Sequence, residues 1–232
     1  MLPGLAMAGA AAAAFLGTLV RSDDPDMFHH LAMGREVVRH GLPSLEPFLY
    51  PLSGVVTGPP PYWLGSVTIY AWHALLGDAG VSLLPAAVGA LLAVVLLLDA
   101  EPRAGCHGLV RFCAAALPIA LAVETYRYRA VARTEIFSAL LLAVTLWSIR
   151  RFEDGRPRAL LALPVVAVIW TNLHPGVALA LVPLGILVAC GAAVILARGR
   201  SASTASGTKS WREVATAAGV TAVFALATAL NP

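Results

Sequence analysis

Three carboxylates stand within four residues near the start of the chain: Asp23, Asp24 and Asp26 directly follow a hydrophobic run. Acidic side chains at the mouth of a membrane helix are costly to keep near lipid, so they usually pair, face water or act on a substrate. Asp24 can cap a helix that Pro25 would begin, and Asp23 is expected to be solvated. Asp26 would lie in the first turn, where the helix dipole stabilises negative charge. Asp26 either interacts with the free backbone N–H groups at the helix start or acts on a substrate.

Three arginines lie within seven residues, at Arg127, Arg129 and Arg133. Arginine offers a planar, permanently charged fork, so this group could bind the phosphate or diphosphate of a lipid-linked donor and stabilise charge on the leaving phosphate. Alternatively, these side chains extend to lipid headgroups, as arginines at helix ends commonly do. The sequence supports the two interpretations equally for Arg127 and Arg129. For Arg133 we favour a structural pairing with Glu135 or a carboxylate of the acidic loop.

Histidines are the remaining candidates for a site. His174 follows Asn172 at the predicted outer end of a hydrophobic helix, where it is either a satisfied interfacial residue or a contact to the donor phosphate or the acceptor. His30 and Asp26 are four residues apart and share a helix face, where His30 could orient the carboxylate or hold a divalent cation. The adjacent His29 would point about 100° away, so a metal site is disfavoured. We expect no cofactor.

The elements that would position these side chains are predicted to be the helices of a membrane protein, because the chain is strongly hydrophobic. Hydrophobic residues make up 59% of the 232 residues, charged residues make up 12%, and the mean hydropathy is +0.78. Soluble domains carry about 25% charged residues. We therefore predict an all-α, polytopic integral membrane protein with a single membrane domain over residues 1–232. The hydrophobic segments expected to be helical are Leu2–Val20, Gly80–Leu98, Phe112–Val123, Ile136–Ile149, Ala159–Asn172, Gly176–Ala197 and Val214–Leu230.

Residues 21–79 form a long insertion between the first two hydrophobic segments, and two further helices are predicted within it. The first begins after the cap Asp24 and ends at His40-Gly41, where glycine stops the helix. The second runs from Tyr62 to Leu76. Its amphipathic aromatic side chains suit a helix that lies at the membrane interface.

The basic residues give two possible topologies for this insertion. Eight of the sixteen fall in residues 150–158 and 198–212, which the positive-inside rule places in the cytoplasm. If Tyr62–Leu76 lies flat, the acidic loop, the arginine group and His174 share the outer side, and the basic residues divide ten inside to six outside. If that helix crosses, the acidic loop is cytoplasmic and the division is thirteen to three. Charge counting alone favours the crossing.

Four motifs resemble, in order, those of bacterial glycosyltransferases of the C superfamily, and the resemblance extends over nearly the whole chain. The motifs are Asp24-Pro25-Asp26-Met27-Phe28-His29-His30-Leu31 with Gly34, Gly41-Leu42-Pro43 and Glu46-Pro47-Phe48; Pro60-Pro61-Tyr62-Trp63-Leu64; Arg133-Thr134-Glu135-Ile136-Phe137-Ser138; and Trp170-Thr171-Asn172-Leu173-His174-Pro175-Gly176. The chain departs from the family pattern at Glu46, where aspartate is usual, at Thr134, where proline is usual, and at Pro175, which intrudes beside the histidine.

The resemblance implies about seven transmembrane helices and a large external loop with horizontal helices, so we prefer the flat position of Tyr62–Leu76. It also implies transfer of a sugar from a polyprenyl-phosphate carrier to an acceptor on the extracytoplasmic face of the bacterial inner membrane. Asp26 best matches the family's catalytic base, which accepts the acceptor's proton, and Asp24 is a weaker candidate. The substrate-binding residues expected from the sequence are Arg127, Arg129, Arg133, His174 and His30.

Such enzymes usually continue into further helices or a soluble domain, which predicts a fragment or a minimal core here. The expected partners are the lipid bilayer, the carrier-linked sugar and an acceptor that is a glycan, a lipid or a protein. Nucleic acid is not expected, because the sequence has no basic stripe with interleaved aromatics. P-loop, zincin and serine-hydrolase motifs are also missing from the sequence.

The alternative function is a transporter or lipid-binding scaffold without chemistry. Prolines at Pro118, Pro164, Pro175 and Pro183 would suit the broken helices of such a protein. A transporter holds ionisable groups near mid-membrane, whereas those of this chain cluster at the predicted helix ends.

Overall fold

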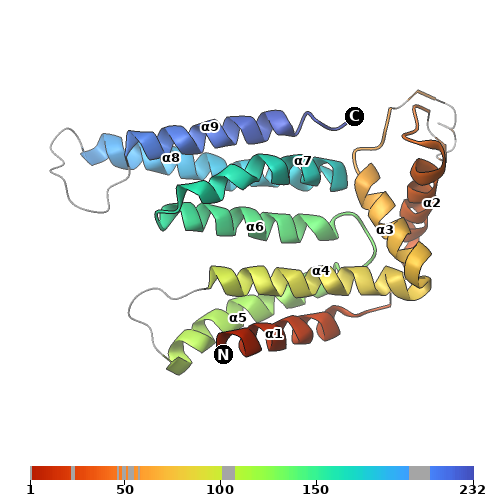
Figure 1. Ribbon diagram of the computed structural model, residues 1–232, viewed down its shortest axis with the longest axis horizontal. Coiled ribbons are helices and arrows are strands. Elements are labelled where there is room, and N and C mark those ends of the chain that lie inside the picture. Colours follow the sequence, from red (N-terminus) through yellow and green to blue (C-terminus); the bar gives the residue numbers. More distant parts are fainter. Residues whose placement is uncertain are drawn as a thin grey trace.

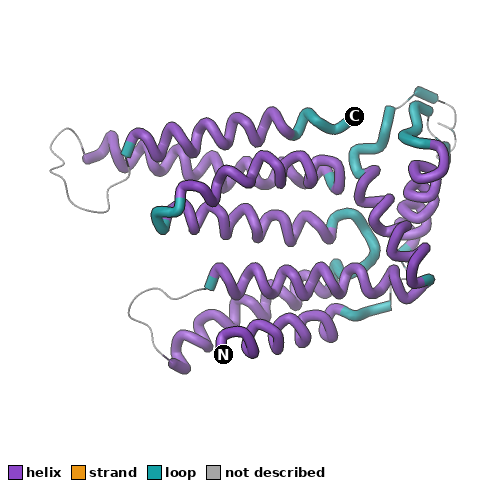
Figure 2. Tube along the Cα trace, viewed as in Figure 1, coloured by secondary structure: helices purple, strands orange, loops and turns teal. Residues whose placement is uncertain are grey.

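The computed structural model describes residues 2–21, 24–45, 47–48, 51, 55–56, 58–100, 108–198 and 210–232. Asp23 and Glu46 lie outside the described residues. Within these ranges the regular structure is helical, and one isolated antiparallel bridge joins Leu45 to Val56. Figure 2 shows how helices dominate the trace. The predicted all-α class is confirmed.

Most helices lie side by side along the long axis of the molecule, and successive ones run in opposite directions (Figure 1). These bundle helices are α1 (Leu2–Thr18), α4 (Asp78–Asp99), α5 (Gly108–Arg127), α6 (Ile136–Glu153), α7 (Leu163–Leu173), α8 (Leu181–Arg198) and α9 (Trp211–Ala227). Short 3-10 turns, η1 (Pro157–Ala162) and η2 (Pro175–Ala180), lead into α7 and α8. Proline begins each turn, because its fixed φ suits a helix start and its missing N–H costs nothing there.

Two helices lie across one end of this bundle and pack against each other: α2 (Pro25–His40) and α3 (Trp63–Leu76). Helix α2 begins as predicted, with the Asp24 side chain accepting a hydrogen bond from the Asp26 backbone N–H at 2.9 Å. It ends at Gly41, whose φ of +86° favours glycine. Helix α3 does not join the antiparallel bundle.

Helix α6 joins two hydrophobic cores. Phe152, near its C-terminal end, packs with α7, α8 and α9 around the fully buried Trp170 and Phe224. Ile136, at its N-terminal end, packs with α3 and α4 around Ile69. Because α6 contributes to both cores, the loop that precedes it and the junction of α7 with η2 are held at the same end of the molecule as α2 and α3.

The sides of the bundle expose large apolar side chains. Leu117, Val182 and Leu226 are 65%, 62% and 72% exposed. Among the described residues, two helical segments, Asp78–Asp99 and Pro175–Ala197, are long and apolar enough to cross a membrane. Exposed apolar area on this scale is unusual for a soluble monomer, so both observations point to a membrane protein.

Candidate functional site

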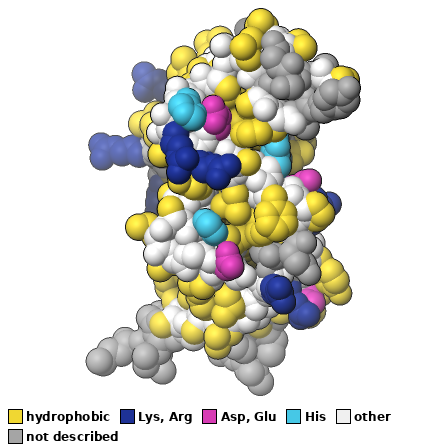
Figure 3. Space-filling model, turned by 90° about the vertical axis from the view of Figure 1, so that its right-hand side faces the viewer, with side chains coloured by type: hydrophobic (Ala, Val, Ile, Leu, Met, Phe, Trp, Pro, Cys, Tyr) yellow, Lys and Arg dark blue, Asp and Glu magenta, His cyan; other side chains and the backbone are white. Residues whose placement is uncertain are grey.

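Charged and histidine side chains gather among apolar ones at the bundle end that carries α2 and α3 (Figure 3). A cavity of about 450 Å³ opens at this end. Its walls come from α2, the segment that enters α3, the loop between α5 and α6, and the junction of α7 with η2. The lining residues are Asp26, His29, His30, Tyr62, Arg133, Thr134, Glu135, His174 and Pro175.

Arg133 connects the α5–α6 loop to the start of α2 through ion pairs with Asp24 and Asp26. One guanidinium nitrogen, Nη2, lies 3.0 Å from Oδ1 of Asp24 and 2.8 Å from Oδ2 of Asp26. The side chain of Asp24 is 19% exposed and is also occupied by capping α2, whereas that of Asp26 is 61% exposed. Of the two carboxylates, Asp26 is therefore the one that a substrate in the cavity can reach.

The surroundings of Arg133 hold its positive charge firmly. Burial by itself would lower the pKa of the guanidinium, but the hydrogen bond and charge of Asp24 and the charges of Asp26 and Glu135 outweigh burial and raise the pKa. Its Nε atom is buried and lacks a hydrogen-bond partner among the described residues. The sequence favoured a structural pairing with Glu135 or a loop carboxylate, and the ion-pair partners are the loop carboxylates.

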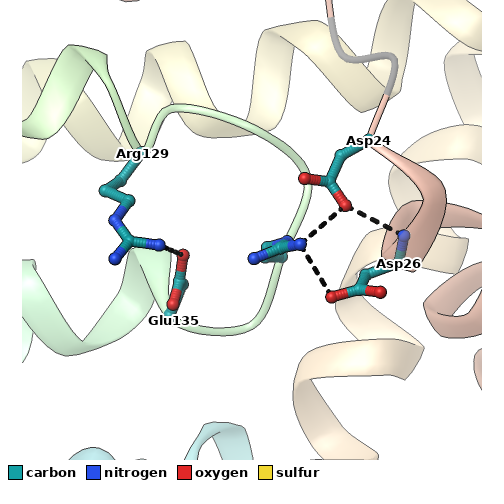
Figure 4. A network of polar contacts seen from close by, with 5 residues as sticks. Asp24, Asp26, Arg129 and Glu135 are labelled. Carbon is teal, nitrogen blue, oxygen red and sulfur yellow. Dashed lines mark hydrogen bonds and ion pairs between the residues drawn. The ribbon is translucent and has the colours of Figure 1, made fainter.

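The other two arginines of the predicted phosphate clamp have separate ion-pair partners. Arg129 pairs with Glu135 at 3.2 Å (Figure 4), and Arg127 pairs with Glu124 at 3.4 Å. Neither Arg129 nor Arg127 lines the cavity. The structure therefore brings Arg133 alone of the three to the cavity wall.

An apolar groove of about 510 Å³ runs between α4, α5 and α6. Its walls include Leu92, Leu96 and Leu142, and its polar residues include Arg129 and Glu135. Because Glu135 lines both the groove and the cavity, the two spaces adjoin at this side chain. An amphiphile could place its apolar chain in the groove and its anionic head near the cavity.

His30 lies in the wall of the cavity on α2 and is only 8% exposed. Its Nδ1 is 3.0 Å from the hydroxyl oxygen of Ser66 on α3. Burial, and then the charge of His29, lower the pKa of His30 to about 4, against a smaller opposing effect of Asp26. The predicted partnership with Asp26 is thus electrostatic, and the hydrogen bond of His30 goes to Ser66 instead.

His174 is fixed by a chain of hydrogen bonds at the α7–η2 junction. Its Nδ1 accepts a hydrogen bond from the Gly176 backbone N–H at 2.9 Å and lies 2.9 Å from the Ser138 hydroxyl. Trp170 donates its indole N–H to the same hydroxyl at 2.8 Å. Burial lowers the pKa of His174, against the charge of Glu135. Of the predicted site residues, Asp26, Arg133, His30 and His174 therefore line one cavity.

A second set of polar contacts supports the wall formed by the segment entering α3. Trp63 donates its indole N–H to Asn172 at 2.7 Å. The side-chain amide of Asn231 donates to the carbonyls of Pro61 at 3.0 Å and Thr171 at 2.9 Å. These bonds tie the insertion to α7 and to the segment after α9.

The sequence interpretation did not include Ser138 or Tyr62 among the site residues. The sequence predicts Tyr62 at the membrane interface, and in the structure its hydroxyl lies 3.1 Å from Nε2 of His29. Ser138 occupies the first turn of an apolar helix, where a buried hydroxyl needs a partner, and this is the sequence signal that could have identified it. Among the described residues, no group of three or more His, Cys, Asp or Glu side chains is placed to hold a metal ion.

Comparisons of this chain with models of protein families, with curated proteins and with solved structures give no match. A functional assignment therefore rests on the site and on the sequence motifs.

Proposed function

We propose that this chain is a membrane glycosyltransferase that moves a sugar from a polyprenyl-phosphate carrier to an acceptor on the extracytoplasmic face of the bacterial inner membrane. One observation carries the proposal: Asp26, Arg133 and His174, from segments far apart in the sequence, meet around one cavity that adjoins an apolar groove. The resemblance of the sequence motifs to glycosyltransferases of the C superfamily supports the same activity.

In this proposal the bundle helices are about seven transmembrane spans, and α2 and α3 lie flat on the outer membrane surface. The charges support this orientation. The basic residues Arg150, Arg151, Arg156 and Arg158 lie at the C-terminal end of α6 and in the segment that follows, at the opposite end of the bundle from the cavity. The positive-inside rule places that end in the cytoplasm and the cavity outside.

The proposed reaction is a direct displacement at the anomeric carbon. The acceptor hydroxyl oxygen attacks this carbon while the Asp26 carboxylate takes up the hydroxyl proton, and the bond from the anomeric carbon to the phosphate oxygen breaks. The carrier phosphate leaves with the bonding electron pair. Arg133 would stabilise the negative charge on this phosphate, and attraction to the phosphate would draw the guanidinium away from Asp26.

The apolar groove suits the isoprenoid chain of the carrier. With the chain along α4 and α6, the phosphate would reach the Arg129–Glu135 pair, at the point where groove and cavity adjoin. The burial of apolar chain would then supply binding energy while the polar cavity positions the sugar.

The test is Asp26→Asn in the full chain, purified and reconstituted in lipid nanodiscs with radiolabelled polyprenyl-phosphate sugars. We expect release of the carrier phosphate to slow by about 100-fold or more, because a general base contributes on the order of 10²–10⁴ to a rate. Asp24→Asn is the matched control. It removes the neighbouring charge but keeps the cap, since asparagine caps helices as well as aspartate does.

A loss in Asp24→Asn as large as that in Asp26→Asn would contradict the assignment of the base. The apolar groove also favours a second candidate, a lipid-binding scaffold without chemistry. For a scaffold, Asp26→Asn would bind polyprenyl phosphate unchanged, and the unaltered protein would transfer no sugar from any carrier tested.

A further inference from the structure

The hydrogen bonds around His174 determine where its ring carries a proton. The Gly176 backbone N–H can only donate, and it points at Nδ1 from 2.9 Å. Nδ1 must therefore present a lone pair. The indole N–H of Trp170 can also only donate, so it fills an acceptor position of the Ser138 oxygen and leaves the hydroxyl proton of Ser138 free to reach Nδ1.

We propose that Gly176, Ser138 and Trp170 fix His174 as the neutral tautomer that is protonated at Nε2, and that this N–H donates a hydrogen bond in the cavity to an oxygen of the leaving phosphate. The phosphate in this inference rests on the proposed function, whereas the tautomer rests on the hydrogen-bond geometry alone. His174 is thus a fixed donor that stabilises charge, and it exchanges no proton with the substrate.

The immediate surroundings leave Nε2 available for this role. His174 lines the cavity, and its Nε2 has no hydrogen-bond partner among the described residues. The other charged and titratable side chains that line the same cavity are Asp26, His29, His30, Tyr62, Arg133 and Glu135. Of these, Glu135 favours a second proton on the ring, but burial opposes it and prevails.

Glycine at position 176 makes this arrangement possible. A Cβ there would stand 2.7 Å from Nδ1 of His174 and 2.7 Å from the hydroxyl oxygen of Ser138. Both distances are far inside normal contact, so any other side chain would push the histidine or the serine away. The close approach of the backbone N–H to Nδ1 therefore depends on this glycine.

The first experiment is nitrogen NMR of the full chain in nanodiscs with ¹⁵N-labelled histidine, using His174→Gln to identify the signals of His174. Near neutral pH we expect Nδ1 to resonate as an unprotonated nitrogen and Nε2 as a protonated one. Ser138→Ala should move the Nδ1 signal, because one of its two donors is lost. A proton on Nδ1, or on both nitrogens, would overturn the inference without touching the proposed glycosyl transfer.

The second experiment measures binding of farnesyl phosphate, with farnesol as the control for the apolar chain. His174→Gln keeps an N–H donor near the position of Nε2, whereas His174→Asn places its amide near Nδ1 and His174→Ala has no donor. We expect Gln to bind farnesyl phosphate nearly as well as histidine does. Asn and Ala should bind it about 10- to 100-fold more weakly, and farnesol binding should not change.

Equal weakening in the Gln, Asn and Ala variants would overturn the donor role. If the unaltered protein binds farnesyl phosphate no better than farnesol, the donor role fails together with the proposed carrier. In that case the NMR measurement still decides the tautomer on its own.

Discussion

His30 is the residue through which pH should act on the fold. It is buried between α2 and α3, and its pKa is lowered from 6.5 to about 4 by burial and by His29. The unfolded chain takes up a proton at His30 below pH 6.5, while the folded protein does so only near pH 4. The contribution of His30 to the free energy of unfolding is therefore fully present above pH 6.5 and is lost as the pH falls from 6.5 to about 4.

We expect the unaltered protein to lose about 3 kcal/mol of unfolding free energy through His30 over this range, since one pKa unit corresponds to about 1.4 kcal/mol. Thermal unfolding in detergent at several pH values measures the loss. His30→Gln should make the stability less dependent on pH. His40→Gln is the control, because His40 lies on the same helix with its side chain 66% exposed. Equal pH dependence in His30→Gln and the unaltered protein would contradict the prediction.

At the residue scale, contacts between near neighbours could be predicted and contacts across the fold could be predicted only in part. Asp24 was predicted as the cap of α2, because the cap and the N–H it accepts are two residues apart. For Arg133 the sequence predicts an ion pair with Glu135 or with a carboxylate of the acidic loop, and no feature of the sequence distinguishes these two partners. The packing of the α5–α6 loop against α2 made the choice and left Glu135 to Arg129.

At the scale of elements, the packing of α2 on α3 depends on Gly34. A Cβ at this position would collide with the backbone carbonyl of Ser66 and would lie 2.6 Å from the Cβ of Tyr70. We expect Gly34→Ala to force the two helices apart and to cost about 1–3 kcal/mol of stability, as overpacking does. Thermal unfolding in detergent measures this cost, and the proposed sugar transfer should fall with it because His30 and Ser66 separate.

Gly219→Ala in α9 is the matched control for Gly34→Ala. It is the same substitution in a helix, but the new Cβ would have no atom within 4 Å. Stability should stay the same or rise slightly, because alanine favours helix over glycine. If Gly34→Ala were as stable as Gly219→Ala, the close packing of α2 on α3 would be wrong.

Helix boundaries with strong local signals were predicted well, and orientation was not decided by sequence alone. Pro25 and Gly41 set the limits of α2, where both signals are local. Charge counting favours a crossing of α3, whereas its aromatic residues and the family resemblance favour a flat position, so the sequence alone leaves the orientation open. In the structure a Cβ on Gly65 would stand 2.5 Å from the carbonyl oxygen of Leu173, so α3 packs directly against the end of α7.

At the scale of the whole molecule, the proposed orientation predicts which end of the bundle faces the outside. Single cysteines would replace the exposed Ser44, near the cavity end, and the exposed Asp154, at the opposite end, after Cys106, Cys113 and Cys190 are removed. An impermeant thiol reagent on intact cells should label the cysteine at position 44. The cysteine at position 154 should react only after the membrane is opened.

Labelling at position 154 with protection at position 44 would invert the orientation and place Asp26 in the cytoplasm. Labelling at both positions in intact cells would mean that an even number of spans separates them. The first result would remove the proposed extracytoplasmic transfer, and the second would contradict the proposal that α4, α5 and α6 each cross the membrane.

The contacts of Asn231 determine the stage of synthesis at which the cavity wall can be completed. Asn231 bonds to Pro61, 170 residues earlier, and to Thr171, and so holds the segment that carries Tyr62 against α7. Ribosomes release a chain from its N-terminus onward, and helices enter the membrane as they emerge. This wall of the cavity therefore gains its last two hydrogen bonds only after α9 has been translated and inserted. Under the proposed function, a nascent chain that still lacks Asn231 would not yet transfer sugar from the carrier lipids around it.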